Sequence, residues 1–167
     1  MWDSTRSLKL SRILVTAFSV MIFMMTFFVP FFAEWYEEAS QGMGLIGGSV
    51  IIPTIICLYI SEGFAVWAIV SLHILLHNIS REQVFIEQNT RCLRSISWAC
   101  MLAGGAFAVM MLWRYLFILP ALAALMLGLI MRVLKNVFEQ AVEIKSENDL
   151  LYNKEGSLCL SLLTLTL

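Results

Sequence analysis

Four long apolar runs, separated by short polar segments, constrain this chain more than any other feature of its sequence. A hydrocarbon core of roughly 30 Å needs about 20 apolar residues in one helix, and the runs are long enough to supply them. Charged residues make up only 14% of the chain, about half the usual share for a soluble domain, and they gather between the runs. The sequence therefore predicts an all-α integral membrane protein, a bundle of four transmembrane helices with an amphipathic helical extension after the fourth.

The boundaries of the spans follow from the positions of charges, prolines and glycines. The first run ends in the bulky string Val29-Pro30-Phe31-Phe32, so we interpret it as an uncleaved span and not as a signal peptide. The third and fourth runs are nearly continuous, and a tight turn at Arg114 keeps that charge out of the bilayer centre. The predicted segments are an N-terminal segment (1–12), span one (13–32), an outer loop (33–49), span two (50–75), a loop with a short helix (76–94), span three (95–113), the outer turn (114), span four (115–134), an amphipathic helix (135–149) and a leucine-rich tail (150–167).

Two short patterns add detail to the polar segments. Ser80 followed by Gln83 resembles a capping box and predicts the start of a short helix that leads into span three. In the tail, Leu158, Leu160 and Leu162 alternate with small residues, which is a strand-like period of two.

Basic residues predict the orientation of the spans. Of the eleven Lys and Arg residues, all but Arg114 lie before span one, between spans two and three, or after span four. The loop after span one carries Glu34, Glu37 and Glu38 and no basic residue. The positive-inside rule therefore places both termini and the middle loop in the cytoplasm.

The sequence shows no motif of an enzyme or of a cofactor site. It contains no P-loop, HExxH motif, dinucleotide fingerprint or Ser/His/Asp arrangement, and its four cysteines form no CxxC pair. The net charge of −1 gives no basic face for nucleic acid. We therefore predict no catalytic residue, no cofactor and no direct contact with nucleic acid.

Glu62 is the sharpest single feature, because it falls near the middle of span two. An intramembrane carboxylate is expensive and suggests cation binding, proton transfer or pairing with another subunit. The alternatives are a neutral, hydrogen-bonded side chain inside the bundle, or a span that is shifted so that Glu62 lies shallower. His73 and His77 are one helical turn apart and can share a metal ion, but without a third ligand two interfacial histidines are the simpler interpretation.

The segment after span four has the pattern of an amphipathic helix, with an apolar row at helical spacing and an acidic end. Such a row needs a cover, which can be the middle segment of this chain, a second copy, another protein or the lipid surface. We predict that it docks a partner together with the middle segment. The candidate docking residues are Val84, Phe85, Leu134, Phe138, Val142, Glu143, Glu147 and Asp149.

Two predicted cytoplasmic strings carry a resemblance to a known family. The first contains Asn78-Ile79, Val84-Phe85, Asn89 and Leu93-Arg94, and the second is NVFEQAVEIKSENDL at 136–150. Together they resemble a family of small bacterial four-span membrane proteins catalogued as domain of unknown function 2975, over most of the chain. The sequence departs from that family at its end, where a leucine-rich tail follows the second string.

The resemblance implies a bacterial inner-membrane location and a cytoplasmic partner, since members are often encoded beside a short helix-turn-helix regulator of the Cro/C1 type. It carries over no catalytic residues. Our first hypothesis is therefore a non-enzymatic membrane protein that binds or sequesters such a regulator. The second is a small transporter or immunity-type protein that uses Glu62 in the bundle. Self-association of the chain is compatible with both.

Overall fold

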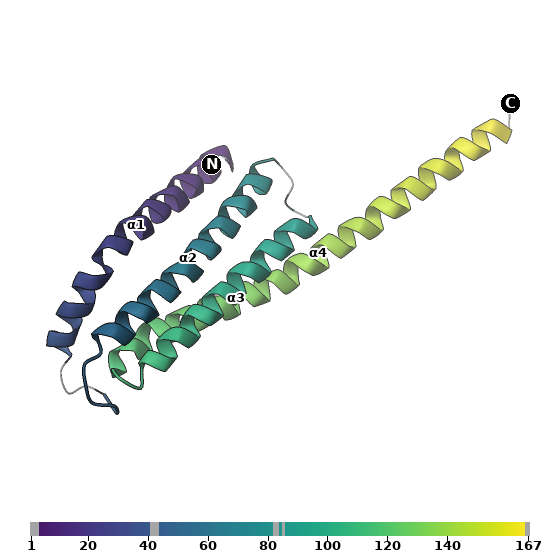
Figure 1. Ribbon diagram of the computed structural model, residues 1–167. Helices are drawn as coiled ribbons and strands as arrows, with labels where there is room; N and C mark the ends of the chain where they lie inside the picture. Colours follow the sequence, from purple (N-terminus) through teal and green to yellow (C-terminus); the bar gives the residue numbers. More distant parts are fainter. Residues whose placement is uncertain (1–3, 41–43, 82–83, 85, 166–167) are drawn as a thin grey trace.

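Helices account for nearly all of the chain that the structure describes. The computed structural model describes residues 4–40, 44–81, 84 and 86–165. Its elements are α1 (Ser4–Ala39), α2 (Ile51–Ser80), α3 (Glu87–Met110), the short 3-10 helix η1 (Tyr115–Phe117) and α4 (Ile118–Leu165) (Figure 1). All four long helices are apolar enough and long enough to cross a membrane. The predicted all-α fold with four spans is confirmed, and the protein is a multi-pass membrane protein.

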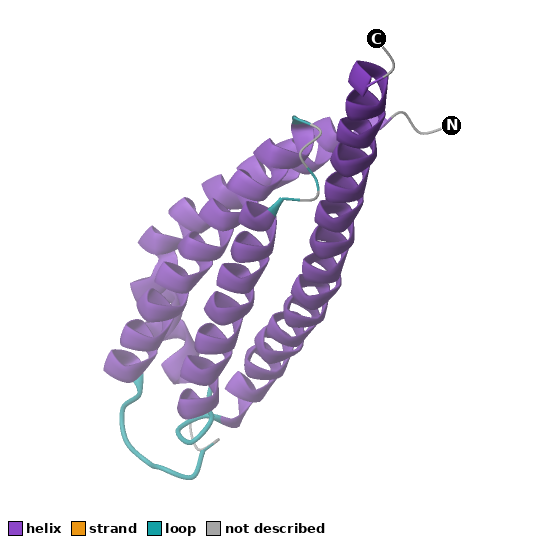
Figure 2. Ribbon diagram, turned by 90° about the vertical axis from the view of Figure 1, so that its right-hand side faces the viewer, coloured by secondary structure: helices purple, strands orange, loops and turns teal. Residues whose placement is uncertain are grey.

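The long helices pack side by side in chain order. α1 contacts α2, α2 contacts α3 and α3 contacts α4, while no other pair of these helices approaches within 8 Å between Cα atoms of described residues. Large apolar side chains such as Phe23, Phe27 and Met126 are exposed on the outer faces, as expected for contact with lipid tails. Figure 2 shows the row from the side, with the start of α1 and the end of α4 at the same end of the molecule.

Small residues allow the close approach of α3 and α4. A Cβ atom added to Gly104 would lie 2.8 Å from the Leu125 side chain, and one added to Gly128 would lie 2.8 Å from the Met101 side chain. Ser97 strengthens the same contact, because its hydroxyl donates to the Gly128 carbonyl at 2.7 Å. This is the packing expected between spans, where small residues and interhelical hydrogen bonds take over from the hydrophobic effect.

One end of the molecule, which we call the Arg114 end, is held together by a buried guanidinium. Arg114 lies between α3 and η1 and donates to the Ser40 hydroxyl and to the Trp113 carbonyl, both at 3.0 Å. The loop before α2 closes on the same turn, since the amides of Leu45 and Ile46 donate to the Leu112 carbonyl. Arg114 is only 4% exposed, so these two hydrogen bonds offset part of the cost of burying its charge.

An acidic side chain also caps a helix at this end. The Glu37 carboxylate, from the last turn of α1, accepts the backbone N–H of Val50 at 2.7 Å. Val50 is the N-cap residue of α2, and it has no side-chain cap of its own. Glu37 falls in the predicted outer loop (33–49), whereas the structure places it in α1 and uses its carboxylate to satisfy a helix N-terminus.

The opposite end, which we call the basic end, is joined by two asparagines. The Asn78 amide, at the end of α2, donates to the Asn89 side-chain oxygen at 2.9 Å, and the Asn89 amide donates to the Val84 carbonyl at 2.7 Å. Both asparagines are buried. Beside them, Leu75, Cys92 and Leu93 form a small apolar cluster, and Phe138 of α4 packs against it.

Two local predictions are wrong. Ser80 does not cap a new helix: it is the last residue of α2, and its hydroxyl donates to the carbonyl of His77. Gln83 lies outside the described residues. The alternating leucines after Gly156 do not form a strand, because α4 continues to Leu165. A strand with no neighbour has no partner for its backbone hydrogen bonds, whereas a helix satisfies them within itself.

Candidate functional site

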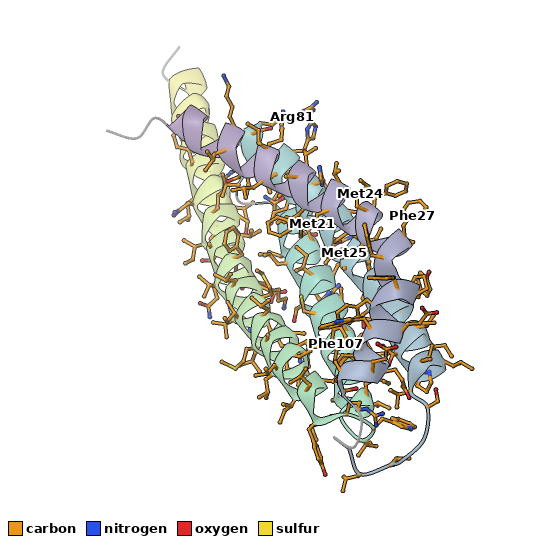
Figure 3. The ribbon with its side chains drawn as sticks, turned by 90° about the vertical axis from the view of Figure 1, so that its left-hand side faces the viewer. Met21, Met24, Met25, Phe27, Arg81 and Phe107 are labelled. Atoms are coloured by element: carbon orange, nitrogen blue, oxygen red, sulfur yellow. The ribbon has the colours of Figure 1, made fainter. Side chains whose placement is uncertain are left out.

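A cavity of about 950 Å³ lies in the middle of the molecule, lined by residues from all four long helices. Its walls are almost entirely apolar. Because α1 and α4 do not contact each other, the cavity is open between these two helices. Met25 and Phe107, which both line it, lie on this side in Figure 3, whereas Met24 and Phe27 are on the outer surface of α1.

Among the described residues that line the cavity, Glu62 is the only one with an acidic or basic side chain. The Thr26 hydroxyl, from α1, donates to Oε1 of Glu62. The other carboxylate oxygen, Oε2, is buried and has no hydrogen-bond partner among the described residues, and the same is true of the Ser61 hydroxyl beside it. The predicted hydrogen bond inside the bundle is therefore present for Oε1 of Glu62 and, within the described part of the chain, absent for Oε2.

A proline in α1 leaves a backbone carbonyl without its helical donor, next to Glu62. Pro30 lies inside the helix and has no N–H, so the carbonyl of Thr26 loses its usual helical donor. The Tyr59 hydroxyl of α2 donates to that carbonyl at 3.4 Å. Thr26 thus joins α1 to α2 twice, through its side chain and through its backbone.

Sequence reasoning found Glu62 but missed the residues around it. Thr26 and Tyr59 are ordinary in an apolar run, and nothing local marks them as partners of a residue on another helix. Two weak signals were present: a proline one turn after Thr26, and a serine directly before Glu62. Both mark points at which backbone or side-chain polarity enters a span.

The two histidines lie at the basic end, away from Glu62. They line a smaller pocket of about 290 Å³ together with Arg12 and Thr16 of α1. His73 Nδ1 lies 3.3 Å from the Ile69 carbonyl. Within the described residues no three His, Cys, Asp or Glu side chains are grouped so that they could hold a metal ion. The neighbouring Arg12 gives the pocket a positive charge, which suits an anion better than a metal cation.

The predicted docking row on α4 consists of Leu134, Phe138 and Val142, and these three side chains differ in how far they are buried. Phe138 packs against the cluster of α2 and α3 at the basic end, and Val142 is half-buried. Leu134 is exposed, at 39%. A neighbouring row is more exposed than these. It consists of Val137, Ile144 and Leu151, at 56%, 60% and 61%.

The remaining docking candidates are spread over this end of the molecule. Glu143 and Val142 line a charged groove of about 550 Å³ between α3 and α4, which also contains Arg94 and two ion pairs. Glu147 is exposed. Val84 offers its carbonyl to Asn89. Phe85 and the side chain of Asp149 lie outside the described residues.

Comparison with known proteins gives one match. Residues 49–151 match the family described as protein of unknown function (DUF2975). The chain belongs to this family. No curated protein and no solved structure is significantly similar to the chain. The matched region of the DUF2975 family includes Glu62, both buried asparagines and the exposed row of α4, whereas α1, with Thr26, precedes it.

Proposed function

We propose that the protein is a non-enzymatic regulatory membrane protein that captures a small helix-turn-helix transcription regulator. The regulator would bind the distal part of α4, by which we mean the helix from Asn136 onward. The observation that carries the proposal is this part of the helix, which projects beyond its neighbours (Figures 1 and 2). Its exposed row of Val137, Ile144 and Leu151 has a spacing of seven, or two helical turns, so the three side chains share one face. An exposed apolar face of this kind fits a groove or helix on a partner protein.

The charge of the distal part of α4 favours a basic partner. Between Asn136 and Tyr152 the only basic residue is Lys145. The acidic residues of the same stretch are Glu139, Glu143, Glu147 and Asp149. Because DNA-binding proteins carry a basic face, this complementarity steers the encounter and makes it sensitive to salt. If α4 covers the DNA-reading face, capture at the membrane also prevents DNA binding.

The proposal requires the distal part of α4 to be cytoplasmic, in a bacterial inner membrane with both termini inside. The distribution of basic residues supports this topology, since all but Arg114 lie in the first twelve residues, between the apolar parts of α2 and α3, or from Arg132 of α4 onward. Cysteine labelling tests it in a cysteine-free chain on intact cells. A cysteine at Glu38 should react with an impermeant maleimide and one at Gln88 should not; the reverse pattern would overturn the topology.

The docking proposal is tested with two adjacent, exposed leucines. Leu151 belongs to the apolar row, whereas Leu150 lies about 100° away around the helix. The full chain in nanodiscs is assayed for binding to the helix-turn-helix protein encoded in the neighbouring reading frame. Burial of such a side chain contributes about 1.5–3 kcal/mol, so Leu151→Ser should weaken binding about tenfold or more, and Ile144→Ser should do the same.

Leu150→Ser is the matched control and should bind with the parental affinity. Equal losses for Leu150→Ser and Leu151→Ser would show that the row is not the docking face. Unchanged binding by all three serine variants would show that this part of α4 does not contact the regulator. Phe138→Ala is unsuitable for this test, because Phe138 packs inside the fold and its loss should lower stability.

Transport is a second candidate function, favoured by the cavity around Glu62. A transporter would lose flux in proteoliposomes when Glu62 is replaced by Gln, while a regulator-binding protein would keep its affinity for the partner. Loss of partner binding without loss of flux in the Leu151→Ser variant would separate the two functions completely.

A further inference from the structure

We propose that the cavity around Glu62 binds a lipophilic organic cation that carries an N–H group and enters from the bilayer. The proposal is independent of the α4 docking surface, and it names the ligand class for the cavity on which the transport candidate rests. Three properties of the lining lead to it: its charge, its unpaired oxygen atoms and its aromatic side chains.

The lining holds one carboxyl group and no basic side chain that could neutralise it. Of the lining residues that the structure describes, Glu62 is the only acidic one, and none is Lys, Arg or His. The described basic residues lie outside the lining. The guanidinium of Arg114 is bound to Ser40 and Trp113, and that of Arg132 in α4 lies 5.5 Å from the centre of the Trp98 ring. Within the described residues no ion pair joins Glu62 to a basic side chain, and a small diffusible cation can supply the missing partner.

Two acceptor atoms point to a ligand with an N–H group. Glu62 Oε2 and Ser61 Oγ are both buried without a hydrogen-bond partner among the described residues, and Ser61 is only 7% exposed. They belong to adjacent residues and line the same cavity. Thr26 occupies the other carboxylate oxygen and so holds Glu62 in place. An acyl chain would fill the apolar space but would leave both acceptors unpaired, which is unfavourable in a low-dielectric site.

Aromatic side chains complete the match with a cation that has an apolar body. Those that line the cavity are Phe28, Phe31, Phe32, Trp35, Phe64 and Phe107. Ring faces attract cations, most strongly where water is excluded, and rings also provide large apolar contact areas. A volume of about 950 Å³ lies in the range of sites for drug-sized molecules.

The route of entry follows from the helix arrangement. α1 packs only against α2 among the long helices, so the space between α1 and α4 faces the bilayer and not another helix of this chain. A lipophilic cation that has partitioned into the membrane can therefore reach Glu62 laterally, without crossing the polar loops at either end.

The experiment uses 9-aminoacridine, an aromatic cation with N–H donors at neutral pH, and the full chain in nanodiscs of zwitterionic lipid. Fluorescence anisotropy should show saturable binding above that of empty nanodiscs. Glu62→Gln should weaken binding at least about tenfold, since it removes the only carboxyl group among the described lining residues, and Ser61→Ala should weaken it several-fold. Glu38→Gln, which removes an exposed carboxylate outside the cavity, is the matched control and should change nothing.

A second measurement locates the ligand without altering Glu62. Trp35 lines the cavity and Trp67 does not. Energy transfer from tryptophan to bound 9-aminoacridine should fall markedly in Trp35→Phe and little in Trp67→Phe. This readout stays decisive even if the Glu62→Gln protein does not fold.

Several results would overturn the proposal. Absence of saturable binding, equal binding by Glu62→Gln and parent, or equal energy transfer in the two tryptophan variants would each place the cation elsewhere or nowhere. Anthracene, a neutral three-ring compound, should bind more weakly than 9-aminoacridine; equal affinity would make the cavity a purely apolar site. Binding without flux in proteoliposomes would refute transport and leave the ligand proposal intact.

Discussion

Replacement of Gly128 by Ala is expected to destabilise the contact between α3 and α4. A Cβ at this position would lie 2.8 Å from Met101 Cγ, 3.2 Å from the Met101 nitrogen and 3.2 Å from the Ser97 carbonyl oxygen. Non-bonded carbon atoms prefer about 3.5–4.0 Å, so the helices must separate or bend. Two of the three neighbours are backbone atoms and cannot rotate away.

The magnitude follows from two opposing terms. An alanine in place of a helical glycine gains about 0.5–1 kcal/mol, because the glycine loses more backbone entropy on folding. Overpacking a close contact costs about 1–3 kcal/mol. The separation of the helices also lengthens the 2.7 Å hydrogen bond from Ser97 to the Gly128 carbonyl, and such interhelical bonds contribute about 0.6 kcal/mol in membranes. We expect a net loss of about 1–3 kcal/mol for Gly128→Ala.

Gly105→Ala is the matched control. A Cβ at Gly105 has no neighbouring atom within 4 Å, so only the favourable backbone term applies and the variant should be slightly more stable than the parent. Thermal unfolding in detergent measures both changes, at about 2–4 °C per kcal/mol for a chain of this size. If Gly128→Ala melts at or above the temperature of Gly105→Ala, then α3 and α4 do not meet as the structure shows.

Two further predictions concern the buried polar contacts at the ends of the molecule. Asn89→Leu should cost about 1–3 kcal/mol, because Asn78 and the Val84 carbonyl lose a buried partner; an unchanged melting temperature would exclude this contact. Arg114→Ala should lower the melting temperature by a similar amount, and Arg114→Lys should restore it only in part, since an ammonium does not reproduce the separate donors that reach Ser40 and the Trp113 carbonyl. Full recovery with lysine would mean that only the charge matters at this end.

The number and the approximate positions of the spans could be predicted from the sequence, because both are local properties of the chain. An apolar run of about 20 residues that crosses the bilayer forms a helix, since only a helix satisfies all backbone hydrogen bonds within a single segment. The turn at Arg114 followed from the cost of a charge at the bilayer centre, and the structure places this residue between α3 and η1. The position of Glu62 within an apolar run likewise needed no tertiary information.

The free face of α4 could not be predicted in the same way. The rows that contain Phe138 and Val137 are neighbours on one helix, and both are apolar enough to pack or to dock. Only the position of α4 beside α3 places Phe138 in the fold and leaves Val137, Ile144 and Leu151 exposed. The physical reason is that a sequence pattern defines a helical face but not its neighbour.

The surroundings of Glu62 also depended on tertiary structure. Its hydrogen-bond partner Thr26 is on another helix and 36 residues away, and the cavity exists because α1 contacts only α2 among the long helices. In a bilayer, apolar residues face lipid and other helices equally well, so hydrophobicity alone does not pair one span with another. The sequence by itself determined that a carboxylate lies in a span, whereas helix packing decided which of its oxygen atoms is paired and which faces an apolar cavity.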